Sequence, residues 1–303
     1  MPAKDPKKVK ILGINGSARH ATTEWGVQLA LKAAESLGYV ETEYVSLGDY
    51  NLKPCTGCMK CFGWHHPADE GLRCYEWNDD TQVLLEKMVD MDGLVIGVPI
   101  YTLGVNSLSR IFMEKCHMFG PMSFGRGAHM LAYKPCGVIT VGGQAIAGQE
   151  AGGLAIWHWA VGIAMLPVNA WPTVQDPNPQ NATHGGFVTS VDARTIYGKN
   201  ALSREACRTV PPTQGIRNER CLRNVGRQVA VTAMVTKTGR KTLLESGFQE
   251  PQFQSFVRYS VKPRPGSWVD SLVKQGKVVY VDKGMEGEEY QEPERMAVDQ
   301  DEK

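Results

Sequence analysis

The side chains with the clearest chemistry in this sequence are four cysteines in one short stretch. Cys55, Cys58 and Cys61 stand three residues apart, and Cys74 follows after an excursion rich in Gly, Trp and His. This spacing lets a tight loop turn several thiolates toward one point, where they bind an iron–sulfur cluster or zinc. The C-x2-C-x2-C run is closer to the ferredoxin pattern than to paired zinc hooks, so it favours a cluster. Zinc, a mixed Cys/His site using His65 or His66, and a run of buried thiols that bind no metal are the alternatives.

A second candidate site follows the first apolar run of the chain, residues 8–14. The loop between this run and a helical segment offers small, hydroxyl and basic residues: Gly16, Ser17, Arg19, Thr22 and Thr23. Backbone N–H groups at a helix start, with hydroxyls and a guanidinium, suit a dianionic monophosphate. The loop matches neither G-x-G-x-x-G nor G-x4-G-K-[ST], which disfavours a dinucleotide fold and a nucleotide triphosphatase. An ordinary Ser/Thr-capped helix is the alternative.

Two further loops carry glycines directly after apolar runs. One spans residues 99–104 and begins Pro-Ile-Tyr, and the other spans residues 141–144 and reads Val-Gly-Gly-Gln. Glycines there let backbone amides approach the nitrogens and carbonyls of a flat ring. Each loop alone indicates only a turn. Together with the phosphate-type loop, on three successive strand ends, they point to a flavin.

The elements that must position these loops alternate along the chain. Short apolar or alternating runs predict strands at 8–14, 41–47, 94–98, 136–141 and 167–170, and helical periodicity predicts helices at 27–37, 79–89, 108–117, 154–165 and 218–238. The alternation predicts an α/β fold, a doubly wound parallel sheet with helices on both faces. Ligands of such sheets bind at the carboxyl ends of the strands.

The remaining segments divide the chain into three parts. We expect one domain over 8–238, which includes a cysteine loop at 54–75 and a long insertion at 171–212 that is rich in Pro, Asn, Gly and Thr and would serve as a functional loop or lid. A weakly patterned C-terminal extension follows at 239–284, with a strand expected at 277–282. The acidic tail at 285–303 is expected to be disordered.

Composition narrows the functional classes. The chain has 303 residues, a net charge of +1 and a pI near 7.6, which gives no electrostatic reason to expect a nucleic acid or an anionic membrane as partner. The N-terminal segment lacks the apolar core of a signal peptide, so the eight cysteines indicate a reducing, cytoplasmic compartment. The apolar stretch 152–171 contains His158 and Pro167 and lacks flanking basic residues. We therefore expect a core helix and a short strand there, and no membrane span.

The motifs GSARHATTE, PIY, GGQAIAGQE and CTGCMKC, with a later Cys and NDD, resemble the flavodoxin-like NAD(P)H-dependent FMN reductases, and among them the iron–sulfur flavoproteins. The resemblance covers about residues 8–170 and resumes at 218. It implies an FMN phosphate held by Ser17, Arg19, Thr22 and Thr23. It also implies a flavin ring flanked by Pro99, Ile100, Tyr101, Thr102, Gly104, Gly142, Gly143 and Gln144. The same resemblance implies a [4Fe–4S] cluster on Cys55, Cys58, Cys61 and Cys74, and a homodimer or homotetramer.

Two departures from the family pattern limit what the resemblance implies. The twelve residues between Cys61 and Cys74 exceed the usual interval, so Cys74 stands in doubt as the fourth ligand. The 171–212 insertion and the C-terminal extension have no evident counterpart, so the family's substrate does not carry over.

The sequence thus predicts an oxidoreductase that passes electrons between a donor, a cluster, FMN and a small-molecule acceptor. The donor would be NAD(P)H or a ferredoxin-like protein. Two alternatives stay open. One is a zinc-stabilised NAD(P)H-dependent FMN reductase, and the other is a non-catalytic electron carrier or redox-sensing flavoprotein.

Overall fold

The computed structural model describes residues 8–61, 72–120, 130–143, 148–171, 186–189, 216–246, 256–258, 265–275 and 279–281. Several predicted features lie outside these ranges: Gln144, His65 and His66, most of the 171–212 insertion, and the acidic tail.

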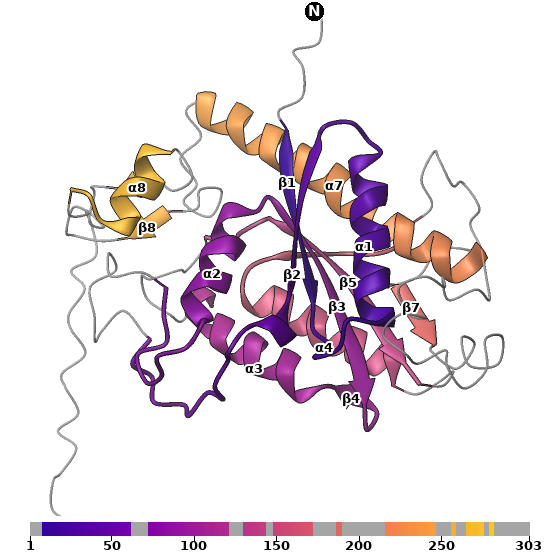
Figure 1. The fold of residues 1–303 in the computed structure, drawn as a ribbon. Helices are drawn as coiled ribbons and strands as arrows, with labels where there is room; N and C mark the ends of the chain where they lie inside the picture. Colours follow the sequence, from indigo (N-terminus) through magenta and orange to yellow (C-terminus); the bar gives the residue numbers. More distant parts are fainter. Residues whose placement is uncertain are drawn as a thin grey trace, which may run out of the picture.

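A parallel sheet forms the centre of the molecule (Figure 1). Its main strands are β1 (Val9–Asn15), β2 (Val40–Ser46), β3 (Gly93–Tyr101) and β5 (Pro135–Gly142), in the spatial order β2-β1-β3-β5. Two short strands, β6 (Leu166–Val168) and β7 (Gly186–Thr189), pair in parallel with successive parts of β5. A two-residue strand, β4 (Gly104–Val105), folds back antiparallel on the end of β3. The predicted parallel α/β sheet is confirmed.

The strands form where the apolar runs predicted them, because a strand buried on both faces needs apolar side chains in both directions. In β1, Leu12 and Ile14 face one core, while Val9 and Ile11 face the other. The 171–212 insertion, which the sequence predicted to be a functional loop or lid, contains a strand that was not predicted, β7. Its four residues, Gly-Phe-Val-Thr, are too few to show an alternating pattern.

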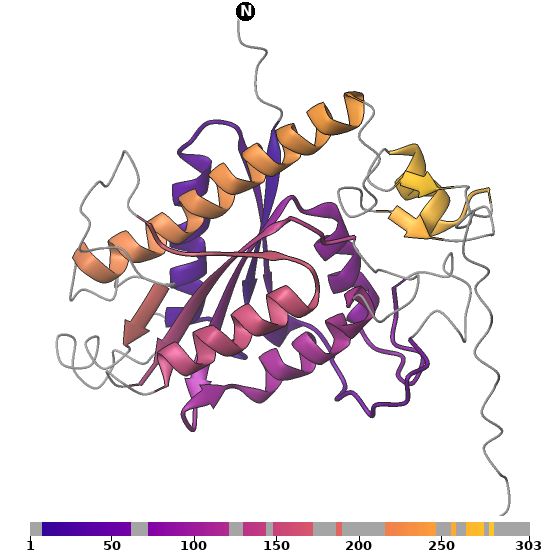
Figure 2. The same ribbon diagram turned by 180° about the vertical axis from the view of Figure 1, so that it is seen from behind.

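Helices cover both faces of the sheet (Figures 1 and 2). On one face, α1 (Thr22–Glu35) packs against α7 (Ile216–Glu245). On the other face lie α2 (Thr81–Asp90), α3 (Ser107–Lys115) and α4 (Gln149–Gly162), with short 3-10 helices η1 (Leu47–Asp49) and η3 (Cys116–Phe119). The helix expected at 154–165 begins five residues earlier, at Gln149, and α7 continues to Glu245 beyond the expected end at 238.

Strand glycines bring α1 and α7 close to the sheet. A Cβ at Gly97 would lie 2.5 Å from Val27 Cγ2, and a Cβ at Gly137 would lie 2.6 Å from Val229 Cγ2. The two helices also approach each other closely, since a Cβ at Gly226 of α7 would lie 1.9 Å from the carbonyl oxygen of Ala30 in α1. Side chains of α1 and α7 therefore fill the space above these glycines, which fixes both helices against the sheet.

A small unit follows α7. It contains the parallel pair β8 (Phe256–Arg258) and β9 (Val279–Val281) together with α8 (Trp268–Lys274), which begins at Ser267 with a side-chain cap to the Asp270 N–H. Leu272 of α8 belongs to the core that α2, α3 and α4 form with the sheet. The strand expected at 277–282 is confirmed as β9, whereas the weak pattern gave no indication of β8 or α8.

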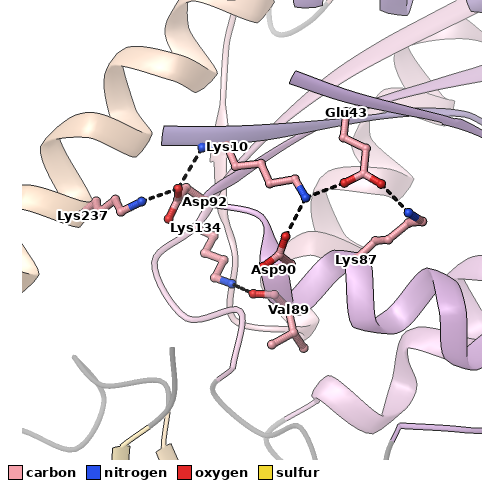
Figure 3. A network of polar contacts seen from close by, with 8 residues as sticks. All are labelled: Lys10, Glu43, Lys87, Val89, Asp90, Asp92, Lys134 and Lys237. Carbon is pink, nitrogen blue, oxygen red and sulfur yellow. Dashed lines mark hydrogen bonds and ion pairs between the residues drawn. The ribbon is translucent and has the colours of Figure 1, made fainter. Parts of the chain in front are cut away.

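A network of charged side chains joins the amino ends of the strands (Figure 3). Lys10 binds both Glu43 and Asp90 at 2.6 Å, Glu43 also pairs with Lys87, and Lys237 of α7 reaches Asp92 at 2.7 Å. The buried Lys134 donates to the carbonyl oxygen of Val89 at 2.7 Å. This network lies at the edge of the sheet opposite the predicted site, where it connects β1, β2, α2 and α7.

Candidate functional site

The phosphate-type loop joins β1 to α1 at the carboxyl edge of the sheet, and its backbone is held by local hydrogen bonds. The Gly16 N–H donates to the carbonyl oxygen of Gly97 at 2.7 Å, and the Ser17 N–H donates to Asn15 Oδ1 at 3.1 Å. The Arg19 N–H donates to Ser17 Oγ at 3.0 Å. Ser17 is buried, while Arg19 projects at the surface. The loop therefore has a fixed backbone and an exposed guanidinium at the start of a helix, which suits an anionic ligand.

Two side chains near the start of α3 support this loop. Asn106 Nδ2 donates to the carbonyl oxygen of Gly16 at 2.9 Å, and Ser109 Oγ donates to the same oxygen at 3.1 Å. Both side chains are buried. A Cβ at Gly16 would lie 2.1 Å from Ser109 Oγ, so only glycine fits here without displacing the loop. Sequence reasoning missed Asn106 and Ser109, because a contact between the end of β1 and α3 leaves no local signal. It also missed Asn15, whose side chain bonds within the loop and to Ser46 of β2.

The structure gives the two predicted threonines different surroundings. Thr22 is the first residue of α1 and is half-buried. Thr23 is buried, and its Cγ2 atom lies 3.2 Å from the Cβ position of Gly97, so its methyl group packs against β3. Contact of these hydroxyls with a phosphate stays a prediction.

The end of β3 and all of β4 form a tight hairpin beside the phosphate-type loop. Thr102 and Leu103, at its tip, both have positive φ (51° and 63°), as a two-residue hairpin turn requires. Pro99 and Ile100 lie in the sheet and are buried, whereas Tyr101 and Leu103 are 47% and 68% exposed. The hairpin thus presents an aromatic and an apolar side chain at the carboxyl edge, where a planar ring would contact them.

The end of β5 completes the edge. A Cβ at Gly142 would collide with the Gln149 side chain, 2.4 Å away, while Gly143 has no atom within 4 Å of its Cβ position. Gly148, at φ +91°, approaches the carbonyl oxygen of Leu103 so closely that a Cβ would lie 2.4 Å from it. The predicted Gly142 and Gly143 therefore lie at the same edge as the hairpin. Gln144 is outside the described residues.

The cysteine loop leaves the same edge from the neighbouring strand β2. We call residues 50–61 the outgoing limb and residues 72–80 the returning limb. Asn51 and Asp80 exchange hydrogen bonds, from the Asn51 N–H to Asp80 Oδ2 at 2.7 Å and from the Asp80 N–H to the carbonyl oxygen of Asn51 at 3.0 Å. The Lys53 N–H donates to Asp79 Oδ2 at 3.0 Å, and Trp77 Nε1 donates to the carbonyl oxygen of Pro54 at 2.9 Å.

These contacts place the limbs antiparallel, because partners further along the outgoing limb lie earlier on the returning limb. The pairing continues to the cysteines, where Lys60 Nζ lies 2.6 Å from Glu76 Oε2. Lys60 chiefly, and Cys58 to a lesser extent, lower the pKa of the Glu76 carboxyl. The ends of the undescribed interval are anchored as well, since Leu72 is buried in the core against which Cys61 packs. Cys55, Cys58 and Cys61 thus lie on one limb and Cys74 on the other.

The loops for the two predicted cofactors adjoin each other at η1. His20, next to the phosphate-type loop, has Nδ1 at 3.1 Å from Glu24 Oε2 and Nε2 at 2.9 Å from Asp49 Oδ1 of η1. Gly48 of η1 approaches Ala18 so closely that a Cβ would lie 2.9 Å from the Ala18 Cα. One continuous edge of the sheet therefore carries both predicted sites.

Three observations bear on whether Cys55, Cys58, Cys61 and Cys74 could hold a metal group. In the part of the chain that the structure describes, no three Cys, His, Asp or Glu side chains gather closely enough to hold one metal ion. Cys55 accepts from the Gly57 N–H at 3.4 Å, a backbone N–H···S contact. Lys115 Nζ, beside Cys74, is buried and lacks a hydrogen-bond acceptor of good geometry among the described atoms. A donor set of four thiols with a buried, unsatisfied cation fits an anionic sulfur-ligated group in its chemistry.

Comparison with known proteins shows which family the chain belongs to. The family model of the NADPH-dependent FMN reductases matches residues 9–176. An iron–sulfur flavoprotein of Methanocaldococcus jannaschii is 35% identical over 143 residues, which cover 47% of this chain and 66% of that protein. An iron–sulfur flavoprotein of Archaeoglobus fulgidus is 30% identical over 161 residues, which cover 52% of this chain and 75% of that protein. The match thus spans just under two thirds of the first relative and three quarters of the second.

A solved structure shows the same fold. The crystal structure of RosB with its bound intermediate 8-demethyl-8-formylriboflavin-5'-phosphate has a TM-score of 0.51 and 15% sequence identity, and the alignment covers 93% of this chain and 98% of that chain. The fold is therefore the flavodoxin-like α/β fold. The chain belongs to the NADPH-dependent FMN reductase family and, as such, is a flavin-dependent oxidoreductase. The resemblance seen in the sequence motifs is confirmed.

The apolar segment at 152–171 folds into a helix and a short strand in the predicted order, but the helix covers the sheet with one face exposed and is not a core helix. It forms most of α4, a turn and then β6, with Ile156 and Ala160 buried and Leu154 and Val161 exposed. Among the helices that the structure describes, none combines the length and the apolar character needed to cross a membrane.

Proposed function

We propose that this protein is an oxidoreductase that uses FMN together with a [4Fe–4S] cluster. The observation that carries the proposal is the antiparallel pairing of the two limbs, which places Cys74 opposite a C-x2-C-x2-C run despite the long interval between them. When bound, FMN supplies one- and two-electron transfer and a cluster supplies one-electron transfer. The relatives named iron–sulfur flavoproteins support the same combination.

The residues that would hold FMN lie on the ends of β1, β3 and β5. Ser17 and Arg19, with Thr22 and Thr23, would bind the phosphate, because the loop backbone and the exposed Arg19 face solvent at the start of α1. The 99–104 hairpin and the 142–144 loop would contact the ring. The exposed Tyr101 is well placed to cover it, since aromatic side chains stack on planar rings.

The residues that would hold the cluster are Cys55, Cys58, Cys61 and Cys74. The clamp formed by Asp79 and Asp80 fixes where the outgoing limb begins, and Leu72 fixes where the returning limb begins. Neither set of contacts involves a cysteine. Both limbs are therefore fixed at one end before any metal binds, so that binding has to order only the residues between these ends, which lowers the entropy lost on binding.

The remaining components of the reaction are proposals that follow from the family. We propose NAD(P)H or a ferredoxin-like protein as electron donor, a small molecule as acceptor, and a homodimer or homotetramer as the assembly. Since β7 is part of the 171–212 insertion and ends at the flavin edge, we propose that the insertion contributes to the acceptor site.

The test is purification without oxygen, followed by analysis of iron, acid-labile sulfide, zinc and FMN and by electron paramagnetic resonance after reduction. We expect FMN and about four iron and four sulfide per chain, as a [4Fe–4S] cluster requires. Zinc in place of iron and sulfide, with FMN present, would instead identify a zinc-stabilised flavin reductase.

A pair of substitutions tests the ligand set. Cys74→Ser should lose or degrade the cluster and leave FMN in place, because oxygen is a poorer ligand than sulfur for these clusters. Cys221→Ala is the matched control, since Cys221 is buried in the core between the sheet and α7, separate from the core that contains Leu72. A Cys74→Ser protein with the full iron content and an unchanged spectrum would remove Cys74 from the ligand set.

A further inference from the structure

A buried lysine lies beneath the cysteine loop. Lys115 is the last residue of α3, and only 3% of its side chain is exposed. Its Nζ lies 3.1 Å from Oδ2 of Asp79, whose side chain is 1% exposed. A lysine is seldom buried to this extent without an ionised partner, because its charge must be stripped of water.

Asp79 alone does not satisfy this lysine. The carboxylate of Asp79 already accepts the N–H of Lys53 on Oδ2 and the N–H of Thr81 on Oδ1, at 3.0 and 3.1 Å. An ammonium group has three donors, and Lys115 Nζ makes no hydrogen bond of good geometry within the described part of the chain. A buried donor left without an acceptor costs free energy, so the site has capacity for a further acceptor.

Two side chains interact with the ammonium of Lys115, Asp79 at 3.1 Å and Cys74 on the same returning limb. The lysine therefore faces the returning limb at the one cysteine whose role the sequence left in doubt. The ordinary explanation is a structural ion pair that ties the end of α3 to the start of α2, and it leaves the surplus donors unexplained.

We propose that Lys115 is a positioning residue for the cluster: its ammonium donates to the sulfur of Cys74 and balances the negative charge of the cluster. This inference rests on the proposed function, since it takes Cys74 as a cluster ligand. Reduction adds one electron to a cluster of thiolate and sulfide ligands, and a cation held in a poorly solvated place stabilises the more negative form. Lys115 thus makes the cluster easier to reduce.

The test compares three variants of the whole, anaerobically purified protein. Lys115→Met removes the charge and the donors, and Lys115→Gln removes the charge while keeping amide donors. Lys237→Met is the matched control, because Lys237 also pairs with an aspartate, Asp92, but does so at the opposite edge of the sheet, away from the cysteine limbs. Asp79 keeps its two backbone N–H donors in all three. The readouts are iron and sulfide content and the midpoint potential of the cluster, followed by electron paramagnetic resonance.

We expect both Lys115 variants to shift the equilibrium between the oxidised and reduced cluster about tenfold toward the oxidised form, which is about 59 mV for one electron. Lys237→Met should change this equilibrium less than twofold. Loss of iron from a folded Lys115→Met protein would also support the proposal, because positioning of Cys74 would then have failed. If Lys115→Met does not fold, the midpoint of Lys115→Gln decides by the same criterion.

Two outcomes would overturn the inference, and they differ from failure of the proposed function. Lys115 variants with full iron content, and with an equilibrium between oxidised and reduced cluster within twofold of that of the parent, would show that the lysine is only structural. A shift no larger than that of Lys237→Met would show the same. A parent protein without iron and sulfide would instead refute the cluster, and this inference would fall with it.

Discussion

Gly16 offers a direct test of how the phosphate-type loop is held. Substitution by alanine would place a Cβ 2.1 Å from Ser109 Oγ, 3.0 Å from the carbonyl oxygen of Gly97 and 3.1 Å from Val98 Cγ1. The loop or Ser109 must then move by about an ångström, and overpacking of this kind costs about 1–3 kcal/mol. The hydrogen bond from Ser109 to the Gly16 carbonyl is lost in the process, which adds about 0.5–1.5 kcal/mol.

We therefore expect Gly16→Ala to lower the free energy of unfolding by about 2–4 kcal/mol, measured by urea denaturation of the flavin-free protein. The same displacement moves Ser17 and Arg19, so FMN affinity, measured by quenching of flavin fluorescence, should fall at least about tenfold, or about 1.4 kcal/mol.

A second substitution makes the explanation refutable. Ser109→Ala removes the atom at 2.1 Å and leaves the Gly97 oxygen, at 3.0 Å, as the nearest contact of the new Cβ. The double variant should recover at least about 1 kcal/mol relative to the sum of the single changes, because the two residues are in contact. Additive effects, or a Gly16→Ala protein within about 0.5 kcal/mol of the parent, would contradict the packing described for this loop.

Three further predictions concern other parts of the molecule. Arg19→Ala should weaken FMN binding about ten- to a hundredfold, since a charge-assisted contact contributes about 1.5–3 kcal/mol, and an unchanged affinity in a fluorescence titration would remove Arg19 from the phosphate site. Gly226→Ala should lower the thermal midpoint, because its Cβ would collide with the backbone of α1. Gly239→Ala, at a position of the same helix with open space around it, should raise the free energy of unfolding by up to about 1 kcal/mol. Equal effects of the two substitutions would refute the close contact between the helices. Burial lowers the pKa of Lys134 to about 7, so between pH 7 and about 10 the unfolded chain holds a proton that the native lysine has released, and native stability rises with pH in this window. Lys134→Met should therefore stabilise the protein most below pH 7, by at most about 5 kcal/mol. A gain in urea denaturation that does not shrink toward pH 10 would contradict the buried charge.

The sequence was informative where one local pattern suffices. Buried strands such as β1 and β3 are nearly continuous apolar runs, and the cysteine spacing is legible without any knowledge of the fold. The alternation of strands and helices then predicts which loops share an edge, because parallel strands all end on the same side of the sheet. Residues 99–104 and Gly142 meet there for this reason.

What the sequence could not predict depends on contacts across the fold. Asn106 and Ser109 reach the Gly16 carbonyl from α3, about 90 positions later in the chain, and polar residues near a helix start ordinarily indicate only a cap. The positive φ of Leu103 follows from the hairpin geometry rather than from its side chain, which disfavours it. A lysine at the end of a helix, such as Lys115, ordinarily lies at the surface. Only the tertiary structure shows that Asp79 and the returning limb cover it.

The pairing of the limbs separates the position of Cys74 from the length of chain between Cys61 and Leu72. Both ends of that interval are anchored by contacts made elsewhere, at Asp79, Asp80 and the core. Because the entropy of closing a loop grows only as the logarithm of its length, doubling the interval costs about 0.6 kcal/mol. The length of the interval thus has little effect on where Cys74 lies, and we expect insertions between Cys61 and Leu72 to cost little folding free energy.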